Sequence, residues 1–305
     1  MASQGNTITY PAYGKINLGL DVVRRLENGY HEVRMIMQTV SLHDVVTMKV
    51  LNEDEIRIHT NSGKIPSDEN NLAFKAAKLM KDQYNIAQGV DIYIEKNIPV
   101  AAGMAGGSTD CAAVLKGMNA LLELGLTQKQ LREEGVKLGA DVPYCIMGGT
   151  ALSEGIVEVL TPIKEPPSCV LLLAKPDIDV STKYVYQNLK LDQLETHPDI
   201  DGMLEDIENQ DLQGLCHKMS NVLETVTGEK YPIIGKIETC MKNAGALQSI
   251  MSGSGPTVFG IFDQKEKAQA AADEITAGGL AGEVYISSFR CSESQCSERK
   301  NNDES

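Results

Sequence analysis

The segment Pro99-Val-Ala-Ala-Gly-Met-Ala-Gly-Gly-Ser-Thr-Asp-Cys-Ala-Ala-Val-Leu115 decides how the rest of this 305-residue sequence is interpreted. Small residues dominate it as far as Gly107, and from Cys111 onward apolar residues recur at helical spacing. This pattern predicts a tight turn followed by a helix with one buried face. Because glycine and alanine have little side chain, a ligand can approach the backbone of the turn closely. The free N–H groups at the start of the helix then favour an anion, and phosphate fits best.

The same segment also fits a strand-to-helix turn that binds nothing, because glycine-rich turns are common. Two other phosphate-binding patterns are excluded. The pattern G-x-x-x-x-G-K-[ST] occurs nowhere in the chain, and the segment does not match G-x-G-x-x-G, which disfavours a dinucleotide-binding crossover. Taken alone, the segment leaves both interpretations open.

Composition and charge restrict the class of protein. Apolar residues make up 42% of the chain and charged residues 23%, which is typical of a globular protein with one large domain or two ordinary ones. No apolar run is long enough to span a membrane and no signal peptide is evident, so we expect a cytoplasmic protein without a membrane partner. The net charge of −14 disfavours nucleic acid as a partner. It also repels a nucleotide triphosphate, so a phosphate site needs local donors and a divalent cation.

The cysteines and histidines indicate neither a disulfide framework nor a zinc site. There are seven cysteines, an odd number without a Cys-x-x-Cys pair, which fits reduced thiols. The five histidines are scattered and form no His-Glu-x-x-His motif. We therefore expect neither disulfides nor zinc to hold the fold together.

The periodicity of apolar residues predicts an α+β fold in two halves. The segment Thr-Pro-Ile-Lys-Glu-Pro-Pro at 161–167 is typical of a connection between domains. We therefore expect one domain over 1–160, a second over 168–290 and a disordered polar tail over 291–305. The expected elements are strands within 7–60, a helix over 71–83, a strand over 90–95, a strand over 169–174, helices within 192–232, a strand over 257–262, a helix over 265–277 and a strand over 284–287.

Local signals predict the surroundings of one aspartate. Thr127 and Gln130 form a capping-box pair at the start of a helix, which we expect to end at Gly139. Pro143 favours an extended backbone at the residue before it. Asp141 is therefore expected in a loop between the end of a helix and the start of a strand.

Several segments together resemble a known family. Pro-x-x-x-Gly-x-x-Gly-Gly-Ser-Thr at 99–109 is similar to the phosphate-binding motif of the GHMP small-molecule kinases. Within that family the chain is most similar to the kinases of 4-diphosphocytidyl-2-C-methyl-D-erythritol, over roughly residues 7–288. The other segments that carry the resemblance are Ala12-Tyr-Gly-Lys-Ile-Asn-Leu18, Asn28-Gly-Tyr-His31, Leu138-Gly-Ala-Asp-Val-Pro143 and Ser252-Gly-Ser-Gly-Pro-Thr-Val-Phe259.

The resemblance implies a fold and an activity. The fold would be the two-domain GHMP kinase fold, with an N-terminal domain like ribosomal protein S5, a ferredoxin-like C-terminal domain and the active site in the cleft between them. The activity would be ATP-dependent phosphorylation of the 2-hydroxyl of this cytidine diphosphate derivative, a step of the non-mevalonate route to isoprenoids. ATP and Mg²⁺ would be the cofactors, and the protein would be a monomer or a homodimer.

The resemblance also assigns the catalytic residues. Asp141 would accept the proton of the substrate hydroxyl, and Lys15 would be its electrostatic partner, because a nearby ammonium keeps a carboxylate ionised. Each residue has a plainer interpretation as well. Asp141 would then be a solvated aspartate at a helix end. Lys15 would be a solvated lysine on the polar face of a half-buried strand, whose other face carries Ile16, Leu18 and Leu20.

The resemblance assigns ATP binding to the whole segment 99–109. Ser108 is also a candidate ligand of Mg²⁺, although hydroxyl residues at a helix start often serve only as N-caps. Ala101 and Ala105 stand where glycine is frequent in this family, so the loop geometry would change if either position required a left-handed backbone. The assigned residues are Pro99, Val100, Ala101, Ala102, Gly103, Met104, Ala105, Gly106, Gly107, Ser108 and Thr109.

The residues assigned to the substrate come from several segments. Tyr30 and His31 follow an Asn-Gly turn, and in the resembling enzymes this dipeptide holds cytosine by stacking and hydrogen bonds. Tyr186 is a candidate for the opposite face of the ring, although it would equally suit a helix core. Asn17 shares a strand face with Lys15 and can reach phosphate or hydroxyl groups, unless it is an ordinary exposed asparagine. The remaining candidates, which include a glycine-rich loop for the diphosphate, are Thr182, Ser252, Gly253, Ser254 and Gly255.

Two rival functions remain open at this point. The first is another GHMP kinase, which would act on homoserine, mevalonate or a sugar; Tyr30, His31 and Lys15 favour the cytidyl substrate over these. The second is a nucleotide-binding regulator on the same fold that catalyses nothing. The presence of both Lys15 and Asp141 argues against this second possibility.

Overall fold

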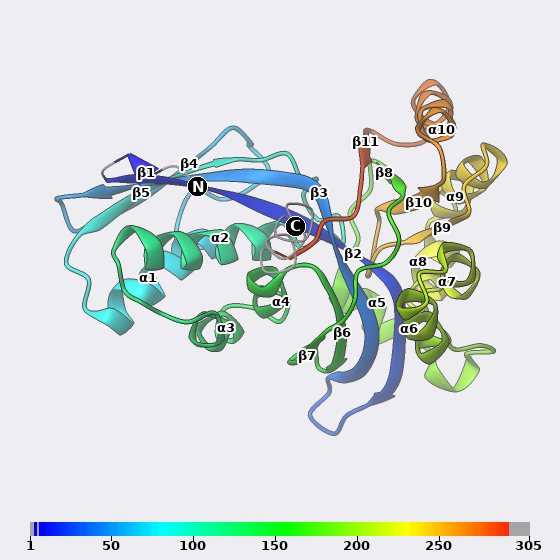
Figure 1. Ribbon diagram of the computed structural model, residues 1–305, viewed down its shortest axis with the longest axis horizontal. Coiled ribbons are helices and arrows are strands. Elements are labelled where there is room, and N and C mark those ends of the chain that lie inside the picture. The colour runs from blue at the N-terminus through cyan, green and yellow to red at the C-terminus, as the bar shows by residue number, and fades with distance from the viewer. Residues whose placement is uncertain (1–2, 5, 293–305) are drawn as a thin grey trace, which may run out of the picture. The chain divides into compact units, whose positions relative to one another are not determined.

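The computed structural model describes residues 3–4 and 6–292 of the chain (Figure 1). The chain forms two compact units, one of residues 1–14, 42–100 and 105–147, and the other of residues 15–41, 101–104 and 148–305. The long strands β2 (Thr7–Arg25) and β3 (His31–Leu51) contribute residues to both units. The units are therefore discontinuous in sequence, whereas the expected domains at 1–160 and 168–290 are contiguous. Those expected boundaries stay a prediction.

The first unit contains one end of a mixed sheet with helices packed on it. The sheet order is β1-β2-β3-β5-β4, and the β3–β5 pairing is antiparallel, whereas the β4–β5 pairing is parallel. Helices α1 and α2 pack against each other. The elements first named here are β1 (Ser3–Gln4), β4 (Ile56–Thr60), α1 (Leu72–Tyr84), β5 (Gly89–Glu95) and α2 (Gly106–Leu121).

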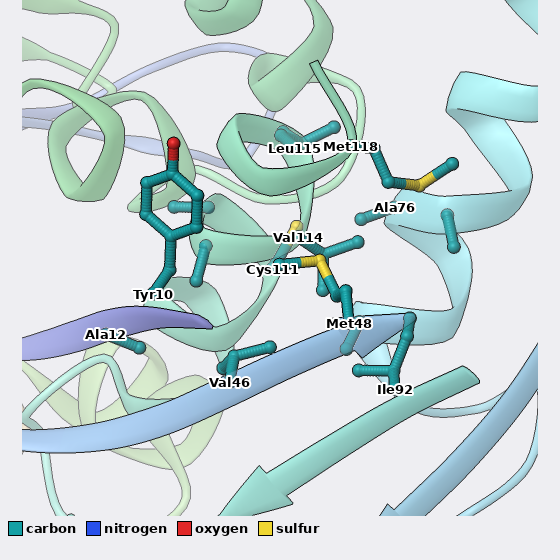
Figure 2. Close-up of a cluster of buried hydrophobic side chains, with 14 of the residues drawn as sticks. Tyr10, Ala12, Val46, Met48, Ala76, Ile92, Cys111, Val114, Leu115 and Met118 are labelled. Atoms are coloured by element: carbon teal, nitrogen blue, oxygen red, sulfur yellow. The ribbon is translucent and has the colours of Figure 1, made fainter. Parts of the chain in front are cut away.

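The core of the first unit lies between this sheet and helix α2 (Figure 2). Sheet residues such as Val46 and Met48 meet the apolar face of α2, which carries Cys111, Leu115 and Met118 as its spacing predicts. Burial of this face fixes the axis of α2, and the glycine-rich turn before it is therefore held at a defined place on the unit.

The helices that follow confirm one local prediction and correct two. Helix α3 (Gln128–Val136) begins with the capping box of Thr127 and Gln130. It ends three residues before Gly139, which does not terminate it. The residues after Asp141 form helix α4 (Val142–Met147) rather than a strand. Proline is tolerated in the first turn of a helix because its missing N–H has no partner there, so Pro143 does not prevent α4.

The second unit contains a separate sheet of four antiparallel strands. Its order is β11-β8-β10-β9, and helices α9 and α10 pack on it and on each other. Strand β10 has all of its residues buried, as expected for a central strand. The bounds are β8 (Val170–Lys175), α9 (Ile233–Asn243), β9 (Gln248–Met251), β10 (Val258–Phe262), α10 (Lys265–Ala277) and β11 (Glu283–Ser287).

The remaining elements of the second unit are a hairpin and a set of short helices. Strand β6 pairs with the first part of β3 and with β7. The helices within 182–230 are short and interrupted, where the sequence analysis predicted a helical region over 192–232. The bounds are β6 (Thr150–Gly155), β7 (Val159–Pro162), α5 (Thr182–Asn188), the 3₁₀ helix η1 (Leu191–Gln193), α6 (Ile200–Glu208), α7 (Leu212–Lys218) and α8 (Glu224–Lys230).

The start of the chain differs from the expected half-buried strand. From Gly14 to Leu20 every residue of β2 is buried, including the residues expected on a polar face. Gly19 shows why, because a Cβ built on it would lie 2.7 Å from the sulfur of Met203 on α6. At Gly19 the face expected to meet water is thus covered by α6, and at Lys15 and Asn17 the loop around Gly253 lies against it.

Two alanines of the glycine-rich segment adopt the left-handed backbone. Ala101 has a φ of 53° and Ala105 a φ of 58°. A residue with a Cβ loses roughly 1–2 kcal/mol in this region, which glycine does not. Both positions where the family frequently has glycine therefore require a left-handed backbone. The two alanines adopt it, so the loop has this geometry in spite of the substitutions.

Other expectations concern the whole chain. Cys111, Cys145, Cys169, Cys216 and Cys240 are reduced thiols, as expected, whereas Cys291 is disulfide-bonded, contrary to the expected reduced state. Most of the predicted disordered tail at 291–305 lies outside the described residues. Within the described part of the chain, no helix combines the length and the apolar character that a bilayer crossing requires.

Candidate functional site

Lys15 and Asn17 lie side by side in the buried part of β2. The Lys15 side chain donates from Nζ to Oδ1 of Asn17 at 2.8 Å, and the Asn17 amide donates to the sulfur of Met35 at 3.0 Å. Lys15 is only 6% exposed and Asn17 is fully buried. The plain interpretations of these residues as a solvated lysine and an exposed asparagine are therefore wrong.

The Lys15 ammonium has no counter-charge among the residues that the structure describes in its own unit. Among the described residues of the second unit, its hydrogen-bond partner is the neutral amide of Asn17, and no carboxylate lies within ion-pair distance. Burying a cation without a paired anion is costly. This position therefore suits a ligand that brings negative charge.

The predicted loop Ser252–Gly255 lies directly against these two residues. A Cβ built on Gly253 would be 3.3 Å from Oδ1 of Asn17 and 3.6 Å from Nζ of Lys15. Ser252 donates from Oγ to the carbonyl oxygen of Gly103 at 3.1 Å. The backbone N–H of Lys15 donates to the carbonyl of Met104 at 3.1 Å. The structure thus brings residues from three of the predicted segments together in the second unit.

The loop is held by residues that sequence reasoning missed. Asn221 donates from its amide to the carbonyls of Met251 and Gly253 at 2.8 and 2.7 Å, and Thr227 donates to the carbonyl of Ser254 at 3.2 Å. Of the predicted residues, Thr182 is hydrogen-bonded through its hydroxyl to that of Ser254 at 2.8 Å. Asn221 and Thr227 carry no sequence signal, because their partners are backbone groups more than twenty residues away.

In the first unit, the start of helix α2 is not capped by any side chain. Its N-cap residue is Ala105, and Gly106 and Gly107 are its first two residues. Ser108 is half-buried in the first turn, whereas Thr109 is buried and donates from its hydroxyl to the carbonyl of Tyr13 at 2.6 Å. Neither hydroxyl residue is the N-cap, so that alternative is wrong. The uncapped N–H groups are the ones an anion can bind.

The three glycines of the segment have different neighbours. A Cβ on Gly103 would collide with the carbonyl oxygen of Ser252, and one on Gly106 would lie 2.8 Å from Nζ of Lys96. At Gly107 the nearest atom would be Cδ1 of Leu72, at 3.6 Å. Backbone packing therefore excludes a side chain at Gly103, and one at Gly106 would crowd the ion-paired ammonium of Lys96, whereas Gly107 is exposed and a Cβ there would make only an ordinary contact.

Asp141 stands immediately before α4 in the first unit. It is half-buried, and its carbonyl accepts the N–H of Cys145 at 3.0 Å, as the residue before a helix does. Among the described residues of that unit, its carboxylate makes no hydrogen bond or ion pair. The side chain is therefore not committed to holding the fold and can accept a proton.

The aromatic residues predicted for cytosine divide into a pair and a separate residue. His31 and Tyr186 pack with ring centroids 5.2 Å apart and planes tilted by 38°. Burial, and secondly the charge of Arg25, lower the pKa of His31, so its imidazole is neutral at pH 7 and has one donor and one acceptor. Val185 is the buried residue of α5, and Tyr186 is half-buried against His31 rather than in the helix core. Tyr30 is 62% exposed.

The donor set beside the uncapped helix is compatible with Mg²⁺. This ion prefers oxygen ligands and is commonly held by substrate phosphates with one or two protein oxygens. The hydroxyl of Ser108, half-buried in the first turn of α2, is such an oxygen.

Comparison with known proteins reveals which family shares this arrangement. Residues 71–149 match the sequence profile described as "GHMP kinases N terminal domain", and residues 203–279 match "GHMP kinases C terminal". A protein of Lachnoclostridium phytofermentans named 4-diphosphocytidyl-2-C-methyl-D-erythritol kinase is 51% identical over 282 residues, covering 92% of this chain and 97% of its own. The chain belongs to the GHMP kinase family. It is a small-molecule kinase with the two-domain α+β fold of that family.

Solved structures support the same assignment. The crystal structure of a 4-(cytidine 5'-diphospho)-2C-methyl-D-erythritol kinase superposes with a TM-score of 0.79 at 28% identity, covering 92% of this kinase and 99% of that chain. A homoserine kinase from Cytophaga hutchinsonii superposes with a TM-score of 0.74 at 20% identity, covering 95% and 96% of the two chains. The second likeness shows only that the fold is shared.

The open space at Gly107 gives a test of ligand binding by the segment. Gly107→Ala is expected to leave the kinase folded, and to raise its free energy of unfolding by up to about 1 kcal/mol, because alanine favours a helix. The KM for the nucleotide is expected to rise at least about tenfold, since the methyl group occupies the space in front of the helix. Steady-state kinetics and urea unfolding measure the two effects.

The matched control for this substitution is Gly125→Ala. Gly125 is also without near neighbours, but it lies beyond the end of α2 with a φ of +70°. This control is expected to lose stability without a change in the KM. An unchanged nucleotide KM in Gly107→Ala would show that the segment is only a structural turn.

Proposed function

We propose that this kinase transfers the γ-phosphoryl group of ATP to the 2-hydroxyl of 4-diphosphocytidyl-2-C-methyl-D-erythritol, a step toward isoprenoid precursors. The observation that carries the proposal is the buried Lys15 ammonium, which lies against the Ser252–Gly255 loop and pairs with no carboxylate among the described residues of its unit. A phosphorylated substrate would supply the missing negative charge. The names of the related kinases give the substrate its identity, and these kinases are similar over most of this chain.

The transfer requires an acceptor for one proton. In the proposed step, the 2-hydroxyl oxygen forms a bond to the γ-phosphorus while its proton passes to the Asp141 carboxylate. The bond between the γ-phosphorus and the β–γ bridging oxygen breaks, and ADP leaves. Lys15 stabilises the negative charge that develops on the reacting oxygens. Among the described residues of their own units, the carboxylate of Asp141 has no partner and the charge of Lys15 is not compensated, and both observations support these roles.

The triphosphate is proposed to bind at the segment 99–109. The uncapped N–H groups at the start of α2 would donate to phosphate oxygens, and the open space at Gly107 would admit them. Ser108 would bind the Mg²⁺ that neutralises phosphate charge when the metal is bound. These local donors would overcome the repulsion from the net charge of −14.

The cytosine ring is proposed to bind beside His31 and Tyr186. A flat base can stack on the pair, and the neutral imidazole can donate to and accept from the edge of the base. Tyr30, which is exposed on the adjoining turn, can cover the ring from solvent. Homoserine and mevalonate have no flat ring, so this aromatic pair favours the cytidyl substrate over those of other family members.

A substrate panel tests the proposed activity directly. Purified kinase with ATP and Mg²⁺ is expected to phosphorylate the cytidyl compound and to leave homoserine, mevalonate and galactose unchanged, because only the first offers a base and a diphosphate. Phosphorylated product is measured by mass spectrometry at equal substrate concentrations. Turnover of one of the other alcohols, with none of the cytidyl compound, would overturn the substrate assignment.

The role of Asp141 is tested by Asp141→Asn. Loss of the base is expected to lower kcat by about a hundredfold to ten-thousandfold, whereas the Kd for an ATP analogue stays within about twofold of wild type. Single-turnover kinetics and calorimetric titration separate the chemical step from binding. Asp21→Asn, which removes a partly buried carboxylate paired with His197, is the control and is expected to keep its kcat. A rate near that of wild type in Asp141→Asn would refute the assignment of the base.

A further inference from the structure

A group of three charged side chains is buried in the first unit and has no role in the activity described so far. Nζ of Lys96 forms ion pairs with Oδ2 of Asp44 and, at 3.0 Å, with Oδ2 of Asp110. The three side chains are 4%, 0% and 3% exposed. Sequence reasoning did not select any of them, although Asp110 directly follows the Ser108-Thr109 pair.

These side chains connect the two ends of the segment 99–109. Before the segment, Oδ1 of Asp44 accepts the backbone N–H groups of Asn97 and Ile98 at 2.6 and 2.7 Å. After it, Asp110 extends from the second turn of α2 to the same ammonium. One lysine thus holds the backbone that enters the segment and the helix that leaves it.

The first residue of α2 is shaped around this lysine. A Cβ on Gly106 would lie 2.8 Å from Nζ of Lys96 and 3.3 Å from Cγ2 of Ile98. A side chain at this position would push against the ion-paired ammonium, and glycine avoids that contact. The position of the uncapped N–H groups is therefore linked directly to the position of Lys96.

Burying these three charged side chains costs free energy of folding, which indicates that they do not serve mainly to stabilise the fold. Two carboxylates share one ammonium, and Oδ1 of Asp110 is buried without a hydrogen-bond partner among the described residues. Burial raises the pKa of Asp110 to about 7, against the opposing effect of Lys96. Buried ion pairs seldom stabilise a fold more than apolar residues would, and an unpartnered buried oxygen destabilises it. Asp44 and Lys96 alone would form a neutral ion pair, so Asp110 is not needed to compensate the charge of the lysine.

We infer that Lys96 and Asp110 are positioning residues of this kinase. By tying α2 to the backbone that enters the segment 99–109, they keep the N–H groups at the start of α2 in the arrangement that binds the phosphates of ATP. This inference rests on the proposed binding of ATP by that segment. Neither residue needs to touch the nucleotide, because each acts through the backbone that it fixes.

The test removes the ion pair between Lys96 and Asp110 and leaves the neutral ion pair between Lys96 and Asp44. Asp110→Ala keeps Asp44 opposite Lys96 and removes the unpartnered oxygen, so its melting temperature is expected to stay close to that of wild type. The KM for ATP is expected to rise about tenfold as the helix start loses its fixed position, with the KM for the alcohol substrate unchanged. Asp110→Asn keeps an oxygen that accepts from Lys96, and is expected to restore most of the ATP affinity.

A matched control separates positioning from general stability. Lys81 is another lysine of the first unit, with its side chain 11% exposed, and it holds the end of α1 through Asp54 and the carbonyls of Ile86 and Gln88. Lys81→Met is expected to lower the melting temperature without a change in the KM for ATP. Lys96→Met, which leaves two buried carboxylates unpaired, is expected to lose both stability and ATP affinity.

Two results would overturn the inference. One is an unchanged KM for ATP in Asp110→Ala, and the other is an equal rise in both KM values. The Kd of each variant for a non-hydrolysable ATP analogue is measured alongside, in the absence of any alcohol. Because no alcohol is present, these Kd values decide the role of Lys96 and Asp110 even if the cytidyl compound proves not to be the substrate. A wrong substrate assignment is therefore distinguishable from a wrong assignment of the positioning residues.

Discussion

The proposed site depends on one constraint, the buried ammonium of Lys15, beside which no counter-charge lies among the described residues of its unit. Lys15 is only 6% exposed, and the partner of its charge in that unit is the amide oxygen of Asn17. A buried cation without a paired anion is unfavourable, and a bound anion would remove that cost. The neighbouring Ser252–Gly255 loop is consistent with an anion site, because it presents backbone and small residues, rather than carboxylates, to the ammonium.

The glycine-rich segment serves several requirements at once. Gly103 admits the carbonyl of Ser252, Gly106 admits the ammonium of Lys96, and Gly107 leaves space in front of an uncapped helix. A sequence motif of small residues is usually explained by the approach of a phosphate. Here Gly103 makes room for backbone and Gly106 makes room for a lysine of the same protein, so the motif is explained by internal packing as well as by the ligand.

The sequence was most informative where local physics decides the outcome. The capping box at Thr127 and the helix over 265–277 follow from side chains a few residues apart, and both are confirmed. One error arose where distant parts of the chain meet. The polar face expected on β2 is covered by α6 at Gly19 and by the Ser252–Gly255 loop at Lys15. Another error was local, because Pro143 stands in the first turn of α4, where proline is tolerated, and so does not force an extended backbone after Asp141. Asn221 and Lys96 could not be predicted, since their partners are brought near only by folding.

The central claim concerns the charge of Lys15, and Lys15→Met tests it most directly, because methionine keeps much of the volume and removes the ammonium. Urea unfolding of the ligand-free protein and kcat for phosphorylation of the cytidyl compound are measured on the same preparation. The account predicts a free energy of unfolding at least as high as that of wild type, together with a kcat lowered about a hundredfold or more. A variant that is destabilised but retains its kcat would contradict it, since the lysine would then support the fold rather than the reaction.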